Sequence, residues 1–254
     1  MSRTLHIQAA GLSRRGLARS DNQDAFAVVP LLGLFVVADG IGGRPAGGAA
    51  SALALAAVRA AMTATPRVRG AAAGALFRAA VEEANLRILA AGEGDPAKLG
   101  MGATFTGALV RGDRVAIAHV GDSRAYLLHQ RRLDRLTEDH VLEHDGMWGA
   151  LDLAERARLA ACRRRLTRAL GIAETVEVDV GLFTPQDGDV LLLCTDGLTA
   201  ALRENEIAGI LLEHPDPEDA AERLIARAGD HGGEDDTTAV VVRWGGEGES
   251  HGRA

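Results

Sequence analysis

Acidic side chains recur at four places where an apolar run meets a tight turn. They are DNQD (21–24) before AFAVV, DG (39–40) after GLFVV, DG (196–197) after VLLLC, and EDD (234–236) before TTAVVV. A carboxylate that is buried alone at a strand end costs free energy, so a fold that gathers several of them needs cations to neutralise them. The sequence therefore predicts a metal site that folding assembles from distant segments.

The ligand chemistry favours a hard divalent cation. Carboxylate and carbonyl oxygens suit Mg²⁺ or Mn²⁺. Zinc is not expected, because the histidines and the two cysteines do not form a compact set of nitrogen and sulfur ligands. A single Asp-Gly pair is more often a turn or a cap than a ligand, so the joint pattern of the four clusters is what favours a metal site.

The composition favours one globular domain whose partners are proteins or small molecules. The chain has 254 residues, 47% of them hydrophobic, which is enough for one large core, and no linker interrupts it. The formal net charge is -7, and the one short basic run is residues 163–165. This charge balance argues against a nucleic-acid-binding or anionic-membrane surface.

Cysteine use and the apolar segments predict a cytoplasmic protein. Cys194 lies within the apolar run VLLLC and is expected to be a buried, reduced thiol, so no disulfide is expected with Cys162. The start, MSRTLHIQAAG, lacks the apolar core of a secretion signal. No apolar stretch approaches the roughly 20 residues of a membrane span, so no membrane contact is expected.

Short apolar runs bounded by Gly, Asp or Arg are expected to be strands, and they are too many for a helical bundle. They are residues 5–10, 25–29, 33–38, 103–110, 114–121, 124–129, 189–194 and 238–243. Helical spacing occurs in pairs of segments between them, at residues 48–64 and 72–91 and again at 204–213 and 217–228. This order predicts an α+β layered sandwich of antiparallel sheets with helices outside, rather than a doubly wound parallel fold.

The clusters and their order resemble the metal-dependent protein serine/threonine phosphatases of type 2C (the PPM family), in their bacterial form. The resemblance covers about residues 5–243. It is carried by RSDNQD (19–24), ADGIGG (38–43), MGATF (101–105), GDSRAY (121–126), LTEDH (136–140), LTRALG (166–171), CTDGLT (194–199) and GGEDDTT (232–238). Any one of these is weak, but eight in family order are very hard to obtain by chance.

The resemblance implies a four-layer αββα sandwich with two mainly antiparallel sheets and a metal site at one end. It implies that Asp39 bridges two Mn²⁺ or Mg²⁺ ions and that the carbonyl of Gly40 binds one of them. Asp196 and Asp235 would complete the shell of the other ion. Glycines at 40, 42 and 43 fit this, because a carbonyl approaches a cation only where side chains do not crowd it.

Three further residues take roles from the resemblance. Asp24 would hold the water on the metal, and Arg19 would grip the substrate phosphate through its planar fork. Arg14 and Arg15 remain alternatives for that grip. Asp122 would bind a weaker third ion together with Asp196, although a tight turn explains Asp122 equally well.

The chain departs from the family pattern at three positions. Gln23 stands where many members have Glu, which is expected to cause a modest loss at most. Asp236 stands where Asn is usual, and it could raise either the metal affinity or the pKa of a neighbour. Ile41 replaces a His that animal members carry as a proposed general acid, so another group must protonate the leaving group.

The predicted function is hydrolysis of phosphoserine and phosphothreonine on proteins by direct attack of a water that two metal ions activate. Residues 1–243 would form the phosphatase domain, with a flap at about 140–165 that is helical at 151–161, and residues 244–254 a disordered tail. The expected partners are phosphorylated proteins, among them a cytoplasmic serine/threonine kinase that the enzyme opposes and its targets, and the protein is expected to be a monomer. A catalytically silent phosphopeptide-binding regulator and a small-molecule phosphatase are the alternatives.

Overall fold

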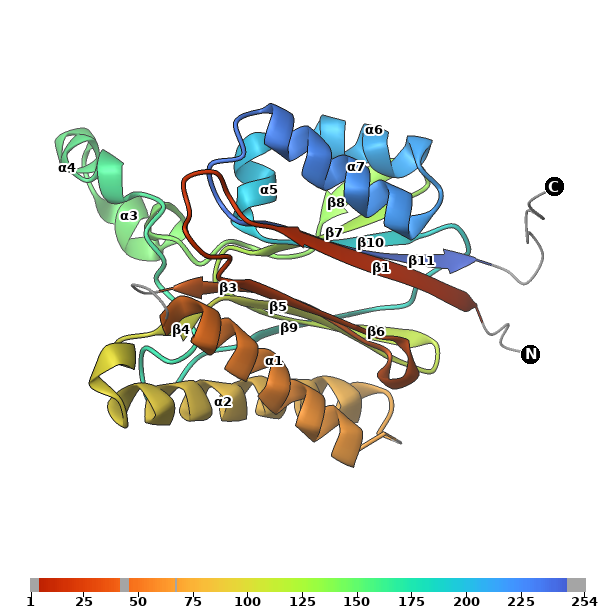
Figure 1. Ribbon diagram of the computed structural model, residues 1–254, viewed down its shortest axis with the longest axis horizontal. Helices are drawn as coiled ribbons and strands as arrows, with labels where there is room; N and C mark the ends of the chain where they lie inside the picture. Colours follow the sequence, from red (N-terminus) through yellow and green to blue (C-terminus); the bar gives the residue numbers. More distant parts are fainter. Residues whose placement is uncertain (1–4, 42–45, 67, 246–254) are drawn as a thin grey trace.

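The fold is a sandwich of two packed sheets with helices on both outer faces, seen edge-on in Figure 1. The computed structural model describes residues 5–41, 46–66 and 68–245. The predictions for Gly42, Gly43 and the tail from residue 246 onward therefore lie outside the described residues.

The first sheet has the strand order β1-β11-β10-β7-β8, and every neighbouring pair is antiparallel. Its strands are β1 (His6–Arg14), β7 (Arg124–His129), β8 (Arg132–Arg135), β10 (Val190–Cys194) and β11 (Thr237–Gly245). The central strands β10 and β11 are almost wholly buried, as their continuous apolar sequences require.

The second sheet has the order β2-β3-β5-β6-β9, also antiparallel, with the two-residue β4 paired to the end of β3. Its strands are β2 (Asp24–Val29), β3 (Leu34–Ile41), β4 (Gly102–Ala103), β5 (Phe105–Arg111), β6 (Arg114–Val120) and β9 (Asp179–Phe183).

Helices cover the outer face of each sheet (Figure 1). The second sheet carries α1 (Ala46–Ala64) and α2 (Ala71–Glu93), and the first carries α5 (Asp196–Ala201), α6 (Glu204–Glu213) and α7 (Pro217–Asp230). Short 3-10 turns lie at Pro30–Leu32, Pro96–Lys98, Leu142–His144 and Ala160–Cys162.

Three apolar clusters hold the four layers together. One joins α1 and α2 to the second sheet, and there Phe77 meets Phe105 edge-on with ring centroids 5.9 Å apart. One lies between the two sheets and includes Phe35 and Trp244. The third joins the first sheet to α5, α6 and α7 around the fully buried Tyr126. The predicted αββα sandwich is thereby confirmed.

Helix α1 is 19 residues long and apolar enough, by length and composition, to cross a membrane, which the sequence analysis did not expect. Its alanine-rich face, including Ala50, Ala54 and Val58, belongs to the cluster between the helices and the second sheet. The apolar composition of α1 is therefore explained by its packing against the second sheet as a core helix.

Residues 140–165 project beside the sandwich as an extension (Figure 1). It contains α3 (Gly146–Ala150) and α4 (Leu153–Arg158), and α4 is shorter than the predicted helix at 151–161. Asp152 caps α4 in a reciprocal capping box with Glu155. An isolated bridge between Val141 and Leu166 closes the base of the extension.

Two strands and one boundary differ from the sequence expectations. Strands β8 and β9 were not predicted. They form sheet edges and read RLDR and DVGLF, and edge strands need neither an apolar run nor strict alternation. At the C-terminal side β11 continues to Gly245, beyond the predicted domain end at 243, because the side chain of Trp244 is buried between the sheets.

Candidate active site

The register of β2 and β3 brings two of the predicted site residues together. Asp24, the first residue of β2, pairs with Asp39 near the end of β3. Residues directly opposite one another in an antiparallel pair project to the same face of the sheet. The backbone of Asp39 is fixed by Thr104, whose Oγ1 accepts from the Asp39 N–H at 2.9 Å and whose N–H donates to the Asp39 carbonyl at 2.8 Å.

The other sheet supplies Asp196 and Asp235 from neighbouring strand ends. Asp196 is the first residue of α5, two residues beyond the end of β10, and Asp235 lies two residues before β11. The N–H of Thr195 donates to the carbonyl of Thr238 at 3.1 Å, so the end of β10 and the start of β11 remain joined up to these acids.

Two threonines of the first sheet hold Asp24 of the second. Thr195 Oγ1 donates to Asp24 Oδ2 at 2.8 Å, and Thr238 Oγ1 donates to the same oxygen at 2.6 Å. Asp24 Oδ1 is buried without a hydrogen-bond partner. These threonines were not predicted as site residues, although each lies within three residues of a predicted metal ligand.

Burial of the carboxylates, reinforced by their mutual repulsion, dominates the electrostatics of the site. Burial, together with the charges of Asp236 and Asp196, raises the pKa of Asp24 to about 7 against the two threonine hydrogen bonds, which lower it. Burial also raises the pKa of Asp39 well above its usual range, and the surrounding carboxylates add to the shift. Burial and the charge of Asp235 raise the pKa of Asp196. Opposing positive charge would lower all three values.

Arg19 forms a two-pronged pair with Asp235 at the edge of this cluster. Its Nε and Nη2 each donate to one carboxylate oxygen of Asp235 at 2.7 Å. The hydrogen bond from Arg19 to Asp235 is the main cause that raises the pKa of this arginine. The predicted phosphate-binding residue Arg19 therefore lies beside the predicted metal ligand Asp235, and its guanidinium group is already paired with that carboxylate.

Asp236 has an anchoring role that the sequence did not reveal. It is buried, and its two oxygens accept from the backbone N–H groups of Gly16 at 2.9 Å and Gln23 at 2.8 Å. These bonds clamp both ends of the loop that carries Arg19. The charge of Asp236 is among the causes that raise the pKa of Asp24, behind burial, and a raised pKa of a neighbour is one of the two outcomes considered for this departure from the family pattern.

Gly40 lacks a side chain for a packing reason. A Cβ there would lie 2.1 Å from the carbonyl oxygen of Gly47 in α1. The side-chain amide of Gln23 packs at the same place, because a Cβ on Gly47 would lie 2.6 Å from its Oε1. Close approach of β3 to α1 is therefore sufficient to require glycine at 40, in addition to any access for a cation. Ile41 ends β3 in register with Gly102.

Asp122 follows β6 and faces the extension at 140–165. Burial and the charge of Asp196 raise the pKa of Asp122 to about 7, which places these two predicted ligands of a third ion near one another. Arg164 of the extension lies 3.9 Å from Asp122 and 3.7 Å from the buried Asp139. The N–H of Gly121 donates to His140 Nδ1 at 3.1 Å, which fixes the start of the extension beside Asp122.

The donor set fits divalent cations in chemistry and charge. Asp24, Asp39, Asp196 and Asp235 present only hard oxygens, and Asp24 Oδ1 is an orphaned buried acceptor. In the part of the chain that the structure describes, no three such side chains stand close enough to hold one ion as they are placed. Asp235 is also paired with Arg19, so these carboxylates lie near one another without forming a closed ligand set.

Comparison with known proteins agrees with this architecture. A family model described as protein phosphatase 2C matches residues 14–230. The chain belongs to the protein phosphatase 2C family. A curated relative, the serine/threonine phosphatase stp of Listeria welshimeri, is 36% identical over 232 residues, which are 90% of this chain and 92% of the relative.

A mycobacterial relative extends the comparison to a solved structure. The serine/threonine protein phosphatase PstP of Mycobacterium tuberculosis is 36% identical over 240 residues, 94% of this chain but 45% of that longer protein. The crystal structure of the PstP catalytic domain with two manganese ions superposes with a TM-score of 0.82 at 34% identity, over 95% of this chain and all of that domain.

These likenesses establish the broad activity. This family member is a protein serine/threonine phosphatase, with phosphoproteins as its class of substrate. The family and the two manganese ions of the PstP domain support dependence on a divalent metal.

Proposed function

We propose that this phosphatase hydrolyses phosphoserine and phosphothreonine at the acidic cluster that joins the two sheets. The observation that carries the proposal is the meeting of Asp24 and Asp39 from one sheet with Asp196 and Asp235 from the other. Buried carboxylates that raise one another's pKa without a cation are expensive for stability, and such arrangements occur at functional sites.

Two Mn²⁺ or Mg²⁺ ions would be held by Asp39, the carbonyl of Gly40, Asp196 and Asp235, with a weaker third ion at Asp122 and Asp196. Such a pair of cations, when bound, activates water as a nucleophile near neutral pH and offsets charge on the phosphoryl group.

Arg19 would bind the substrate phosphate, and Asp24 would orient the attacking water. Arg19 already accommodates two coplanar oxygens on its Nε and Nη2 edge, and the same edge suits two oxygens of a phosphate monoester. Asp24 Oδ2 is fixed by two hydroxyl donors, which leaves Oδ1 to orient the attacking water. Ile41 offers no proton to the leaving group, so aryl phosphates, whose leaving groups need protonation least, should be the substrates least affected by the lack of an acid at this position.

The proposal extends to the opposing kinase, the cellular compartment and the oligomeric state. The enzyme would oppose a serine/threonine kinase, because phosphoserine and phosphothreonine on proteins are the products of such kinases. Cys162 and Cys194 are free thiols, which suits the reducing cytoplasm. Exposed large apolar side chains are scattered over separate elements of the described chain, which favours a monomer.

The test compares classes of substrate under one set of metal conditions. Phosphate release from phosphoserine and phosphothreonine peptides, sugar phosphates and nucleotides is measured with Mn²⁺, with Mg²⁺ and with excess EDTA. The proposal expects metal-dependent turnover with kcat/KM highest for the peptides. Preference for a sugar phosphate would support the small-molecule phosphatase instead, and metal-dependent peptide binding without turnover would support the silent regulator.

A further inference from the structure

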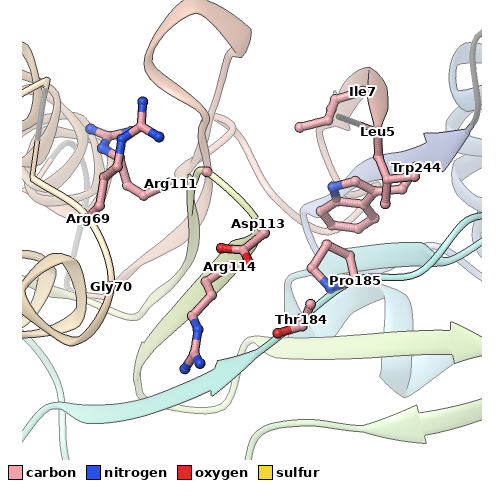
Figure 2. A pocket seen from close by; sticks show the side chains of 11 residues that line it. Leu5, Ile7, Arg69, Gly70, Arg111, Asp113, Arg114, Thr184, Pro185 and Trp244 are labelled. Atoms are coloured by element: carbon pink, nitrogen blue, oxygen red, sulfur yellow. The ribbon is translucent and has the colours of Figure 1, made fainter. Parts of the chain in front are cut away.

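Strand β6 leads directly into Asp122, and the turn between them is held by an imidazole that the proposed mechanism does not use. The strand begins at Arg114, beside a pocket at the end of the sandwich remote from the acidic cluster (Figure 2). It ends at Val120, so Gly121 alone separates it from Asp122. The position of the Asp122 carboxylate therefore depends on the backbone of Gly121.

Gly121 is constrained at its N–H, at its carbonyl and at its α-carbon. Its N–H donates to His140 Nδ1 at 3.1 Å, and its carbonyl accepts from the N–H of His140 at 2.7 Å. Its φ is +108°, and a Cβ there would lie 2.7 Å from the side chain of Thr104, which holds the backbone of Asp39. The turn before Asp122 is therefore fixed between His140 and the residue that fixes Asp39.

The hydrogen bonds define the tautomer of His140. A backbone N–H can only donate, so Nδ1 accepts and the ring proton lies on Nε2. Nε2 then donates to Asp179 Oδ2 at 3.2 Å, and Arg168 Nη1, which also lies 3.2 Å from Nε2, donates to Asp179 Oδ1 at 3.0 Å. Burial of the ring lowers the pKa of His140 and favours this neutral form. Both ring nitrogens are thereby used, one toward Gly121 and one toward β9.

His140 is also the residue at which the extension leaves the sandwich. Its carbonyl accepts from the N–H of Thr167 at 2.8 Å, which ties the start of the extension to the segment that follows its end. The ring of His119, in β6, lies with its centroid 4.7 Å from that of His140, and its Nε2 donates to the carbonyl of Glu138 at 2.9 Å. The base of the extension is thus attached to the end of β6 at several points, directly before Asp122.

We propose that His140 is a positioning residue for Asp122. Its Nδ1 holds the N–H of Gly121, so that the Asp122 carboxylate stays near Asp196, its partner in binding the weakest of the three ions. Groups that orient a metal ligand commonly change metal affinity or activity by about 10- to 100-fold when they are replaced. The inference rests on the proposed function, because it concerns the ion assigned there to Asp122, and it adds a residue that touches neither substrate nor metal.

Two substitutions separate the two ring bonds of His140. His140→Asn keeps an oxygen at the place of Nδ1, which can accept from Gly121, but it cannot reach Asp179. His140→Gln keeps an N–H that can reach Asp179 but offers Gly121 only a methylene group. Both keep the backbone bonds of residue 140. His129→Gln is the matched control, because it removes the bond of another imidazole to a carboxylate, that of Asp189, at the far end of β7.

The assay counts Mn²⁺ ions in the absence of substrate. Electron paramagnetic resonance reports free Mn²⁺ during titration of each folded protein, and Asp122→Asn identifies the ion that depends on Asp122. The proposal expects this ion to bind His140→Asn and His129→Gln as it binds the wild type, and to bind His140→Gln about tenfold more weakly. Adding His140→Gln to Asp122→Asn should change neither Mn²⁺ binding nor kcat further. Urea unfolding in EDTA reports any purely structural loss.

Three results would overturn the proposal. One is equal binding of this ion to both His140 variants, whether weakened or not, since the bond to Gly121 would then not matter. The second is a further fall in kcat when His140→Gln is added to Asp122→Asn, because His140 would then act by another route. The third is a wild type without an ion that depends on Asp122. Mn²⁺-dependent turnover of a phosphothreonine peptide by the wild type shows separately whether the proposed catalytic function holds.

Discussion

Replacing Asp24 with Asn should make the metal-free protein more stable while it disables the enzyme. Burial among other acids raises the pKa of Asp24 to about 7 from an ordinary value of 3.8. The folded protein therefore binds this proton more tightly than the unfolded chain does. The stability that the proton confers is complete below about pH 4 and is lost as the pH rises to about 7.

The size of the effect follows from the shift. About three pK units at about 1.4 kcal/mol each give roughly 4 kcal/mol at pH 8, of which about 2.5 kcal/mol accrues between pH 5 and pH 8. An Asn side chain keeps an oxygen to accept from Thr195 and Thr238 but carries no charge. Asp24→Asn should therefore unfold roughly 10 °C higher than the wild type at pH 8 in EDTA.

The assay is urea and thermal unfolding at pH 5 and pH 8 in excess EDTA, and again in Mn²⁺. Asp21→Asn, which alters an exposed carboxylate nearby, is the matched control and should follow the wild type. In Mn²⁺ the advantage of Asp24→Asn should shrink, because a cation would stabilise the wild-type carboxylate. Equal pH slopes for the wild type and Asp24→Asn would refute the reasoning.

Three further changes probe the same site. Arg19→Lys should raise KM for a phosphothreonine peptide about tenfold, because the two-pronged geometry is lost, and steady-state kinetics with an unchanged KM would count against phosphate binding by Arg19. Thr195→Val should cost about 1 to 2 kcal/mol in urea unfolding and lower kcat, since one donor to Asp24 is removed; full stability and kcat would contradict that role. Gly16→Ala would place a Cβ 2.3 Å from the backbone carbon of Asp235, so kcat/KM should fall while the far-UV spectrum is retained.

The sequence predicted the acids of the site because strand ends and turns leave strong local signals. Asp24, Asp39 and Asp196 each border an apolar run, and the register of two antiparallel strands is enough to pair the first two. The layered architecture was predictable for the same reason, since the central strands are continuously apolar and the helices occur in pairs between them.

Other features depend on contacts between distant segments that no local pattern encodes. The bonds from Thr195 and Thr238 to Asp24 cross from one sheet to the other, and the clamp of Asp236 on Gly16 spans 220 residues. The edge strands β8 and β9 were missed because packing on one side leaves their sequences free to be polar.

Phosphate release from a phosphothreonine peptide tests the central claim most directly. The wild type and Asp39→Asn are assayed with Mn²⁺ and with excess EDTA, after both are shown to fold. The account predicts turnover by the wild type that requires Mn²⁺ and falls to background in Asp39→Asn. Equal metal-dependent turnover by Asp39→Asn would contradict the assignment of the acidic cluster as the catalytic metal centre.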